Sequence, residues 1–278
     1  MTPEFYNKIN VVPRKDAETL FGKIVKDYGS DAKFGTVLDI GCATGNVTIK
    51  FFEHFECNNL VAFDKNESMV EFAQINNHRS EINYCVADVA DSIIKLKSAL
   101  KMNEQADVVY SNHCLQCSEQ QTVSLSNVLE LMRPGAKLYM SFAFWTDIVA
   151  CLHNFVRNSK WNQQIDEERF MTIVPFKSLV CPDVNVCREQ WTKLLSSCGF
   201  QNISVSLNES KSYFDNFDDF AKTVLMQINF NAFLNDSDKE ECVKNEIQYL
   251  RDNYNPGYKR NSDPFEMRYH YCIIAAEK

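Results

Sequence analysis

Residues 37–46 read Val-Leu-Asp-Ile-Gly-Cys-Ala-Thr-Gly-Asn, an apolar run with an acid near its end and two glycines four residues apart. A continuous apolar run bounded by turn residues is typical of a buried parallel strand. Gly41 and Gly45 allow a sharp turn and a close approach of the backbone to a ligand at the start of the next helix. A dinucleotide fingerprint requires Gly-x-Gly-x-x-Gly, but Ala43 and Asn46 occupy its second and third glycine positions. The stretch therefore predicts a strand–turn–helix ligand site and gives poor support to pyrophosphate binding.

Alternating strands and helices follow this turn. Strands are expected at 60–64, 82–86, 106–111 and 137–143, and helices at 47–55, 67–76, 91–101 and 119–132. Such alternation at short spacing predicts an α/β fold, a doubly wound and mostly parallel sheet with helices on both faces. Ligands of these sheets bind at the carboxyl ends of the strands. Asp39, Asp64, Asp88 and Ser111 all stand at such ends, which predicts one shared ligand cleft.

Two of these acids have alternative interpretations. Asp64 lies 25 residues after Asp39, where doubly wound sheets often place an acid that accepts hydrogen bonds from ribose hydroxyls. Alternatively, Asp64 is an acid that the dipole of helix 67–76 favours. Asp88 and Val89 could hold an adenine amino group and ring, or Asp88 could simply cap helix 91–101. Ser118 and Gln121 predict a capping box at the start of helix 119–132.

The remainder of the chain frames this alternating region. A leading helix is expected at 14–28, so that residues 1–30 would cover the site. After residue 143 the regular alternation of strands and helices ends, and helices are expected at 147–158, 188–197, 216–234 and 236–253. Strands expected at 203–207 and 268–275 complete a seven-stranded sheet. The apolar face of 216–234 is either core or a lid over an apolar pocket.

Composition excludes several classes of protein. The 278-residue chain has a net charge of -8, which gives no electrostatic footprint for nucleic acid. We find neither a signal pattern at the N-terminus nor an apolar run of the roughly 18 residues that a membrane span needs, and we therefore expect a cytoplasmic protein. The eleven cysteines are scattered, which favours free thiols. Cys114 and Cys117 form a single C-x-x-C without a second pair, so no metal site is expected.

Several motifs together resemble class I S-adenosylmethionine-dependent methyltransferases. They are Asp39-Ile40-Gly41-Cys42, Asp64, Met132-Arg133-Pro134-Gly135 and Gly199-Phe200. Three more stretches resemble the arthropod juvenile hormone acid methyltransferases, namely Phe5-Tyr6-Asn7-Lys8-Ile9-Asn10, Val109-Tyr110-Ser111 with Leu115, and Lys160-Trp161-Asn162. The resemblance implies S-adenosyl-L-methionine as cofactor and a lipophilic small molecule, a farnesoic or juvenile hormone acid, as the substrate whose carboxylate is methylated. It also implies one methyltransferase domain over 1–278, with a cofactor-binding half at 31–143 and substrate-cap insertions and final strands at 144–278.

The resemblance also assigns roles to individual residues. Cofactor contacts are expected from Asp39, Gly41, Ala43, Gly45, Asp64, Asp88, Val89 and Ser111, substrate contacts from Asn112, Trp145 and Trp161, and catalytic roles from His113 and Gln116. A carboxylate is already ionised at neutral pH, so methyl transfer to it needs orientation and no strong base. A hydroxyl or amine acceptor would need a base, for which His113 is the nearest candidate.

The chain departs from the juvenile hormone acid methyltransferases at three positions. Ala43 replaces a glycine, which is tolerable at negative φ and costly at positive φ. Pro13 and Cys117 stand where the family has the glutamine and tryptophan that donate to the substrate carboxylate. Gln116, Asn112 or His113 could replace those donors, since all three carry side-chain donors on one loop. The departures keep open a second class, a cofactor-binding relative that has lost catalysis.

Overall fold

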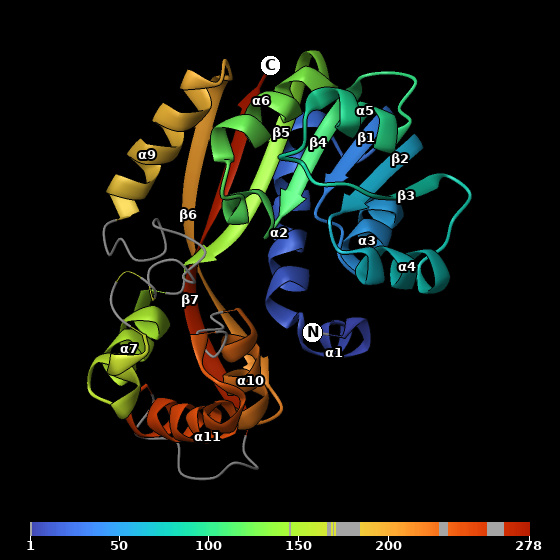
Figure 1. Cartoon of the computed structure of the whole chain (residues 1–278). Coiled ribbons are helices and arrows are strands. Elements are labelled where there is room, and N and C mark those ends of the chain that lie inside the picture. Colours follow the sequence, from blue (N-terminus) through green and yellow to red (C-terminus); the bar gives the residue numbers. More distant parts are fainter. Residues whose placement is uncertain are drawn as a thin grey trace. The chain divides into compact units, whose positions relative to one another are not determined.

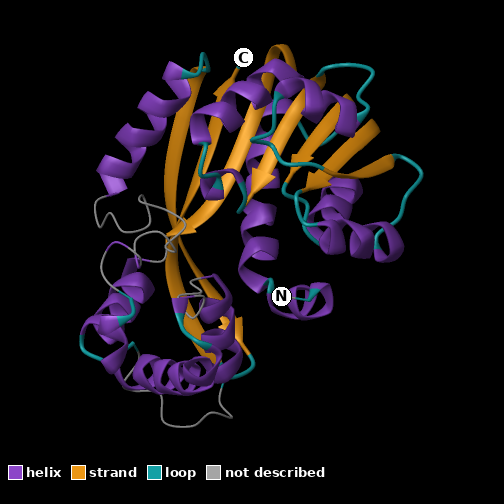
Figure 2. Ribbon diagram, in the orientation of Figure 1, coloured by secondary structure: helices purple, strands orange, loops and turns teal. Residues whose placement is uncertain are grey.

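A computed structural model describes residues 2–144, 146–165, 168, 170, 184–227, 233–254 and 264–278. Its centre is a seven-stranded sheet of order β3-β2-β1-β4-β5-β7-β6 (Figure 2). The strands are β1 (Lys33–Ile40), β2 (Glu56–Asp64), β3 (Ile82–Val86), β4 (Ala106–Asn112), β5 (Met132–Phe144), β6 (Gln201–Phe214) and β7 (Phe265–Glu277). The strand order reverses between β1 and β4, which is where doubly wound sheets bind their ligands.

The first five strands pair with one another in parallel. Lys278, directly after β7, exchanges backbone hydrogen bonds with Gly135 and Ala136 near the start of β5. The end of β7 therefore lies beside the beginning of β5, so this pair of strands is antiparallel. The predicted α/β fold with a mostly parallel, seven-stranded sheet is confirmed.

Helices alternate with these strands (Figure 1). They are α1 (Pro3–Ile9), α2 (Val11–Tyr28), α3 (Asn46–His54), α4 (Glu67–Asn76), α5 (Ile93–Leu100), α6 (Gln121–Leu131), α7 (Thr146–Arg157), α9 (Val184–Ser197), α10 (Phe217–Gln227) and α11 (Asp236–Asn253), with short 3₁₀ turns η1 (Leu115–Cys117) and η2 (Lys160–Gln163). Most predicted helices appear within a few residues of their expected bounds. Of the expected segment 216–234, residues 228–232 lie outside the described residues.

Strand β1 forms the centre of the core. It pairs with β2 on one side and with β4 on the other. The side chains of Val37, Leu38 and Ile40 are each at most 1% exposed. A strand that is covered on both faces carries apolar side chains on both of them, so apolar and polar residues do not alternate along it. This explains the apolar run at the beginning of residues 37–46.

An aromatic cluster holds α2 and α3 against β4. Phe51 of α3 stacks on Tyr110 of β4 with ring centroids 4.7 Å apart, and Phe21 of α2 meets both rings edge-on. Phe55 packs against Phe51 at 4.7 Å. Such offset and edge-to-face pairs add about 0.5–1.5 kcal/mol each to the burial of the rings. This packing fixes α2 along the sheet, so that its first turn reaches the carboxyl end of β4.

The chain forms two compact units. The first contains residues 1–143, 185–208 and 271–278, and the second contains 144–184 and 209–270. One boundary between them lies at 143/144, and 185–208 and 271–278 belong with the first unit. The expected division into a cofactor-binding half and a substrate cap stays a prediction. The second unit has its own aromatic core, in which Trp161, Phe217, Phe220 and Phe265 are at most 1% exposed.

Two local predictions were wrong. The expected capping box at Ser118 is absent, because α6 begins at Gln121 after Gln120, and the Ser118 hydroxyl instead bonds the Ser124 hydroxyl at 2.6 Å. Strand β6 is far longer than the expected 203–207. Many of its side chains are polar and only partly buried, so the hydropathy of the sequence did not indicate the full length of this strand. Among the described helices, none is both long and apolar enough to cross a membrane.

Candidate functional site

The turn after β1 is built from left-handed backbone. Gly41, Ala43 and Gly45 have φ of 83°, 45° and 78°, and Gly45 is the N-cap of α3. The Gly41 amide donates to the Phe63 carbonyl near the end of β2 at 2.8 Å. A Cβ atom at position 41 would lie 2.2 Å from the Cβ of Cys114. Glycine is therefore required at this position, because the loop after β4 fills the space beside it.

Ala43 holds a backbone conformation that glycine adopts more easily. We expect Ala43→Gly to raise the free energy of unfolding by about 0.5–1 kcal/mol, because the left-handed region costs an L-residue roughly 1–2 kcal/mol. The greater freedom of glycine in the unfolded chain offsets part of this gain. Chemical denaturation measures the change. Ala62→Gly, in the buried strand β2, is the control and should destabilise. An equal loss in both variants would contradict the argument.

Asp64 connects the glycine turn to the next helix. Its Oδ2 accepts from the Ala43 amide at 3.0 Å, and its Oδ1 accepts from the Asn66 amide at 2.9 Å. Burial raises the pKa of this carboxyl, and the hydrogen bonds from Asn66 and Ala43 oppose the rise. Each carboxylate oxygen has room for a second donor. Asp64 thus shapes the turn and keeps acceptor capacity for a ligand.

Asp39 lies deeper than the sequence suggests. Its carboxylate is 2% exposed, and Oδ2 accepts from the Thr48 hydroxyl at 2.7 Å and the Tyr110 hydroxyl at 2.8 Å. Burial raises the pKa of Asp39 to about 7. The observed bonds join β1 to α3 and β4, so the structure shows a positioning role; the expected cofactor contact stays a prediction.

Asp88 does not cap a helix. Helix α5 begins at Ile93 with Ser92 as its N-cap, while Asp88 Oδ1 accepts from the Ala90 amide at 2.9 Å in the preceding loop. Val89 is 8% exposed. Asp88 lines an open hollow at the carboxyl ends of β2 and β3, together with Lys65, Asn66, Glu67, Val86, Ala87, Asp91, Lys95 and Ala99. The simple capping alternative is therefore wrong, and Asp88 is placed beside open space.

Ser111 and Asn112 at the end of β4 hold neighbouring backbone. The Ser111 hydroxyl donates to the Ile40 carbonyl at 3.2 Å and accepts from the Leu115 amide at 3.1 Å. Asn112 donates to the Pro13 carbonyl at 2.9 Å and accepts from the Ser141 hydroxyl at 2.5 Å. Both side chains are buried, so the observed contacts anchor the loop and the start of α2.

Of the two expected catalytic residues, His113 lies on the loop that leads into η1, and Gln116 lies within η1. His113 Nε2 lies 2.7 Å from Asp16 Oδ2, and the side chains are 10% and 1% exposed. The ring therefore already has a carboxylate partner on α2. Gln116 is 4% exposed, and its backbone carbonyl accepts from Gln121 Nε2 at 3.1 Å.

Of the two expected substrate-binding tryptophans, Trp161 belongs to the second unit. Trp145 lies outside the described residues. Trp161 sits in η2 with 1% of its surface exposed, and the Lys160 ammonium lies 4.5 Å from the centre of its ring. The structure therefore shows Trp161 as a core side chain of the second unit, and its contact with substrate stays a prediction.

Sequence reasoning missed three residues from the two N-terminal helices. Asp16 is an acid on the apolar stripe of α2, four residues before Leu20, and this placement was the available signal for a buried partner. Tyr6 and Asn10 of the α1–α2 region also lie at the site. Charge interactions couple Tyr6 to Asp64, and burial together with Asp64 raises the pKa of Tyr6. The Thr44 hydroxyl bonds Asn7 Oδ1 at 3.4 Å, which links α1 to the glycine turn.

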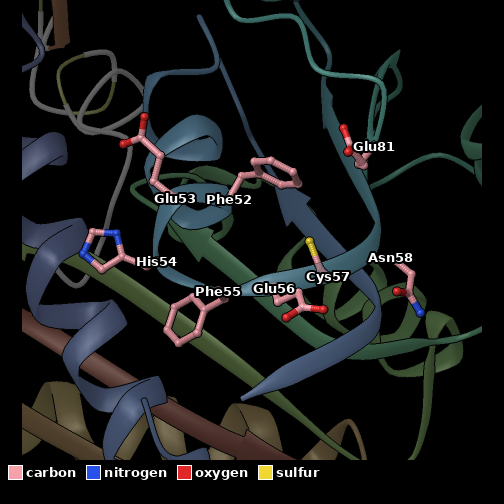
Figure 3. Close-up of a pocket in the computed structure, with 8 residues that line it drawn as sticks. All are labelled: Phe52, Glu53, His54, Phe55, Glu56, Cys57, Asn58 and Glu81. Atoms are coloured by element: carbon pink, nitrogen blue, oxygen red, sulfur yellow. The ribbon is translucent and has the colours of Figure 1, made fainter. Parts of the chain in front are cut away.

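A second hollow lies at the opposite end of β2 (Figure 3). Its lining residues are Phe52, Glu53, His54, Phe55, Glu56, Cys57, Asn58 and Glu81. Glu56 begins β2 and Asp64 ends it, so this hollow is separate from the acids at the strand ends. No group of three or more potential metal ligands occurs among the residues that the structure describes.

The sheet order, the left-handed turn after β1 and the acid at the end of β2 define a class I S-adenosylmethionine-dependent methyltransferase. Comparison with known families agrees. The chain belongs to the family described as Methyltransferase domain, which matches residues 32–178.

Individual relatives are distant. The 235L protein of Invertebrate iridescent virus 6, provisionally named a methyltransferase, is 24% identical over 157 residues, and the match spans 56% of each chain. Juvenile hormone acid O-methyltransferase of Bombyx mori is 23% identical over 235 residues, which covers 82% of this chain and 79% of that protein. Among solved structures, phosphoethanolamine N-methyltransferase 2 of Haemonchus contortus, bound to phosphomonomethylethanolamine and S-adenosylhomocysteine, aligns with a TM-score of 0.51 and 15% identity. That alignment covers 94% of this chain and 52% of the other, and it supports the fold.

Proposed function

We propose that the protein methylates the carboxylate of a lipophilic small molecule, an acid similar to farnesoic or juvenile hormone acid, with S-adenosyl-L-methionine as methyl donor. The observation that carries the proposal is the set of acceptors at the strand ends, Asp64 and Asp88, beside the left-handed turn after β1. A carboxylate acceptor needs no base because it is ionised at neutral pH, so the engagement of His113 by Asp16 at 2.7 Å can serve to position the loop after β4. The similarity to a juvenile hormone acid O-methyltransferase supports the same acceptor.

The residues at the strand ends fit the cofactor. S-adenosylmethionine supplies a methyl group that is already activated on a sulfonium, and the molecule also carries an ammonium group. The site offers acceptors to the polar groups of such a molecule, namely the carboxylates of Asp64 and Asp88 and the buried Asn10 Oδ1, which lacks a hydrogen-bond partner among the described residues. Asp64 would hold the ribose hydroxyls, Asp88 and Val89 the adenine, and the turn from Gly41 to Gly45 the methionine end.

The chain itself would contribute mainly orientation. Asn112 and His113 fix the start of α2 through Pro13 and Asp16, so the loop after β4 and the N-terminal helices form one supported wall. Holding donor and acceptor in a reactive arrangement can lower a barrier by about 7–11 kcal/mol in favourable cases.

The role of His113 can be tested directly. We expect His113→Gln to lower kcat for an acid substrate by less than tenfold, because glutamine still offers a donor to Asp16 and no base is needed. Loss of a general base would instead lower the rate by about 10²–10⁴-fold. Initial rates under saturating cofactor measure the change. A loss of that size, with cofactor affinity unchanged, would favour a hydroxyl or amine acceptor.

Asp64 provides the corresponding test of cofactor binding. We expect Asp64→Ala to weaken the binding of S-adenosylhomocysteine by about 1–3 kcal/mol, the scale for losing hydrogen bonds to a charged group. Isothermal titration calorimetry measures the affinity. Glu71→Ala, which removes an exposed acid of α4 outside the hollow, is the control. Unchanged affinity in Asp64→Ala would limit this residue to its contacts with Ala43 and Asn66.

Two measurements decide between the proposed enzyme and its alternative. A titration with S-adenosylmethionine tests cofactor binding, and a panel of fatty, isoprenoid and small aromatic acids tests methyl transfer. Binding with transfer to a lipophilic acid supports the proposal. Binding without transfer to any acid favours a cofactor-binding relative with a regulatory role, which the departures at Ala43, Pro13 and Cys117 motivate. Absence of binding would overturn both.

A further inference from the structure

Asn10 stands at the junction of the two N-terminal helices. It is the C-cap of α1 and the N-cap of α2, and its backbone amide donates to the Tyr6 carbonyl at 3.0 Å. An asparagine at an N-cap ordinarily accepts a hydrogen bond from an amide of the first turn through its side-chain oxygen. The Asn10 side chain makes no such cap bond. The side-chain oxygen Oδ1 therefore does not accept the amide hydrogen bond that an N-cap asparagine usually accepts.

The Asn10 side chain is nevertheless buried. Only 5% of the residue is exposed, and its Oδ1 has no hydrogen-bond partner in the part of the chain that the structure describes. A buried acceptor without a donor destabilises a fold, because the group loses its water without compensation. The Asn10 side chain opposes the rise that burial gives the pKa of Tyr6, so the two side chains lie close together. Oδ1 is the unmatched atom of the Asn10 amide.

The surroundings of this atom belong to the candidate site. Charge interactions couple Tyr6 to Asp64, Cys114 and Cys117. Cys114 in turn lies against Gly41. Asn10 is thus within one helical turn of a side chain that borders the glycine turn, on the segment that Asn7 links to Thr44. An incoming ligand that fills this region would meet an acceptor in need of a donor.

We propose that Asn10 is a cofactor-positioning residue, whose Oδ1 accepts a hydrogen bond from the ammonium group of the methionine moiety. The inference rests on the proposed cofactor and adds a contact to it. The ammonium is the strongest donor on that end of the molecule, and hydrogen bonds to a charged group are the stronger kind. The contact would satisfy the buried oxygen and couple the two N-terminal helices to the occupied site.

Two ligands separate this contact from a general loss of binding. S-adenosylhomocysteine contains the amino-acid end, whereas 5′-methylthioadenosine lacks both the ammonium and the carboxylate. We expect Asn10→Leu to weaken S-adenosylhomocysteine binding at least tenfold by calorimetry and to change methylthioadenosine binding less than twofold. We expect Asn10→Asp, which keeps an acceptor oxygen, to bind S-adenosylhomocysteine within threefold of the wild type. Lys8→Ala, an exposed change on α1, is the control and should alter neither ligand.

The results that would contradict this inference differ from those that would contradict the proposed function. Equal losses for both ligands in Asn10→Leu would overturn the inference, as would unchanged S-adenosylhomocysteine binding. A strong loss in Asn10→Asp would also overturn it, because an ammonium donor tolerates a carboxylate. Methylthioadenosine binding reports that the variants are folded. If the wild-type protein binds neither ligand, the proposed function itself fails, and that result is separate from the others.

Discussion

Replacing Gly41 by alanine is expected to lower the free energy of unfolding by roughly 2–5 kcal/mol and to abolish cofactor binding. Gly41 has φ of 83°, a region that costs an L-residue roughly 1–2 kcal/mol. The new Cβ would also lie 2.2 Å from the Cβ and 2.3 Å from the Sγ of Cys114, and such overpacking costs typically about 1–3 kcal/mol. The displaced atoms belong to the loop after β4, so the turn and the loop would be disturbed together.

Gly135 supplies a matched control for this variant. Its φ is 77°, but a Cβ built on it would meet nothing within 4 Å. Gly135→Ala therefore isolates backbone strain and should cost only roughly 1–2 kcal/mol. Chemical denaturation of both variants measures the difference, and Cys114→Gly in the Gly41→Ala background should recover part of the loss through coupling. An equal loss of unfolding free energy in Gly41→Ala and Gly135→Ala would show that the Cys114 side chain moves away from the new Cβ at little cost.

Much of the cofactor half could be predicted because its signals are local. An apolar run predicts a buried strand, and an acid directly after such a run lies at the carboxyl edge of the sheet. On this basis Asp64 and Asp88 were placed correctly at the strand ends, beside the turn and the open hollow. Gly41 was expected to turn the chain, and its φ confirms that.

The roles of the side chains on the loop after β4 could not be predicted. Asn112 and His113 carry donors and were expected to face a substrate, yet their partners are Pro13 and Asp16 of α2, which lies about a hundred residues earlier in the chain. Such contacts depend on how α2 packs on the sheet, which hydropathy alone does not determine. The same limit applies to Cys114, whose fit beside Gly41 requires two distant loops to meet.

The second large effect is expected in the second unit, at Glu246 of α11. Its side chain is 0% exposed, and neither carboxylate oxygen has a hydrogen-bond partner among the residues that the structure describes. Burial raises the pKa of this carboxyl well above its ordinary value of 4.5. Leaving a buried polar group unsatisfied costs about 1–3 kcal/mol. We therefore expect Glu246→Met, a replacement of similar length without the carboxyl, to raise the free energy of unfolding by that amount at neutral pH.

The gain from Glu246→Met should depend on pH with a definite sign. The folded wild type keeps a proton on Glu246 that the unfolded chain releases above about pH 4.5, so wild-type stability falls as the pH rises from there toward the raised pKa. The difference in stability between the Glu246→Met variant and the wild type should therefore be small near pH 4 and grow toward neutral pH. Denaturation between pH 4 and 8 measures it. Glu240→Met is the control, since Glu240 is exposed, pairs with Lys244 and has a lowered pKa. If Glu246→Met destabilises at every pH, the carboxyl has a partner in solution and the argument fails.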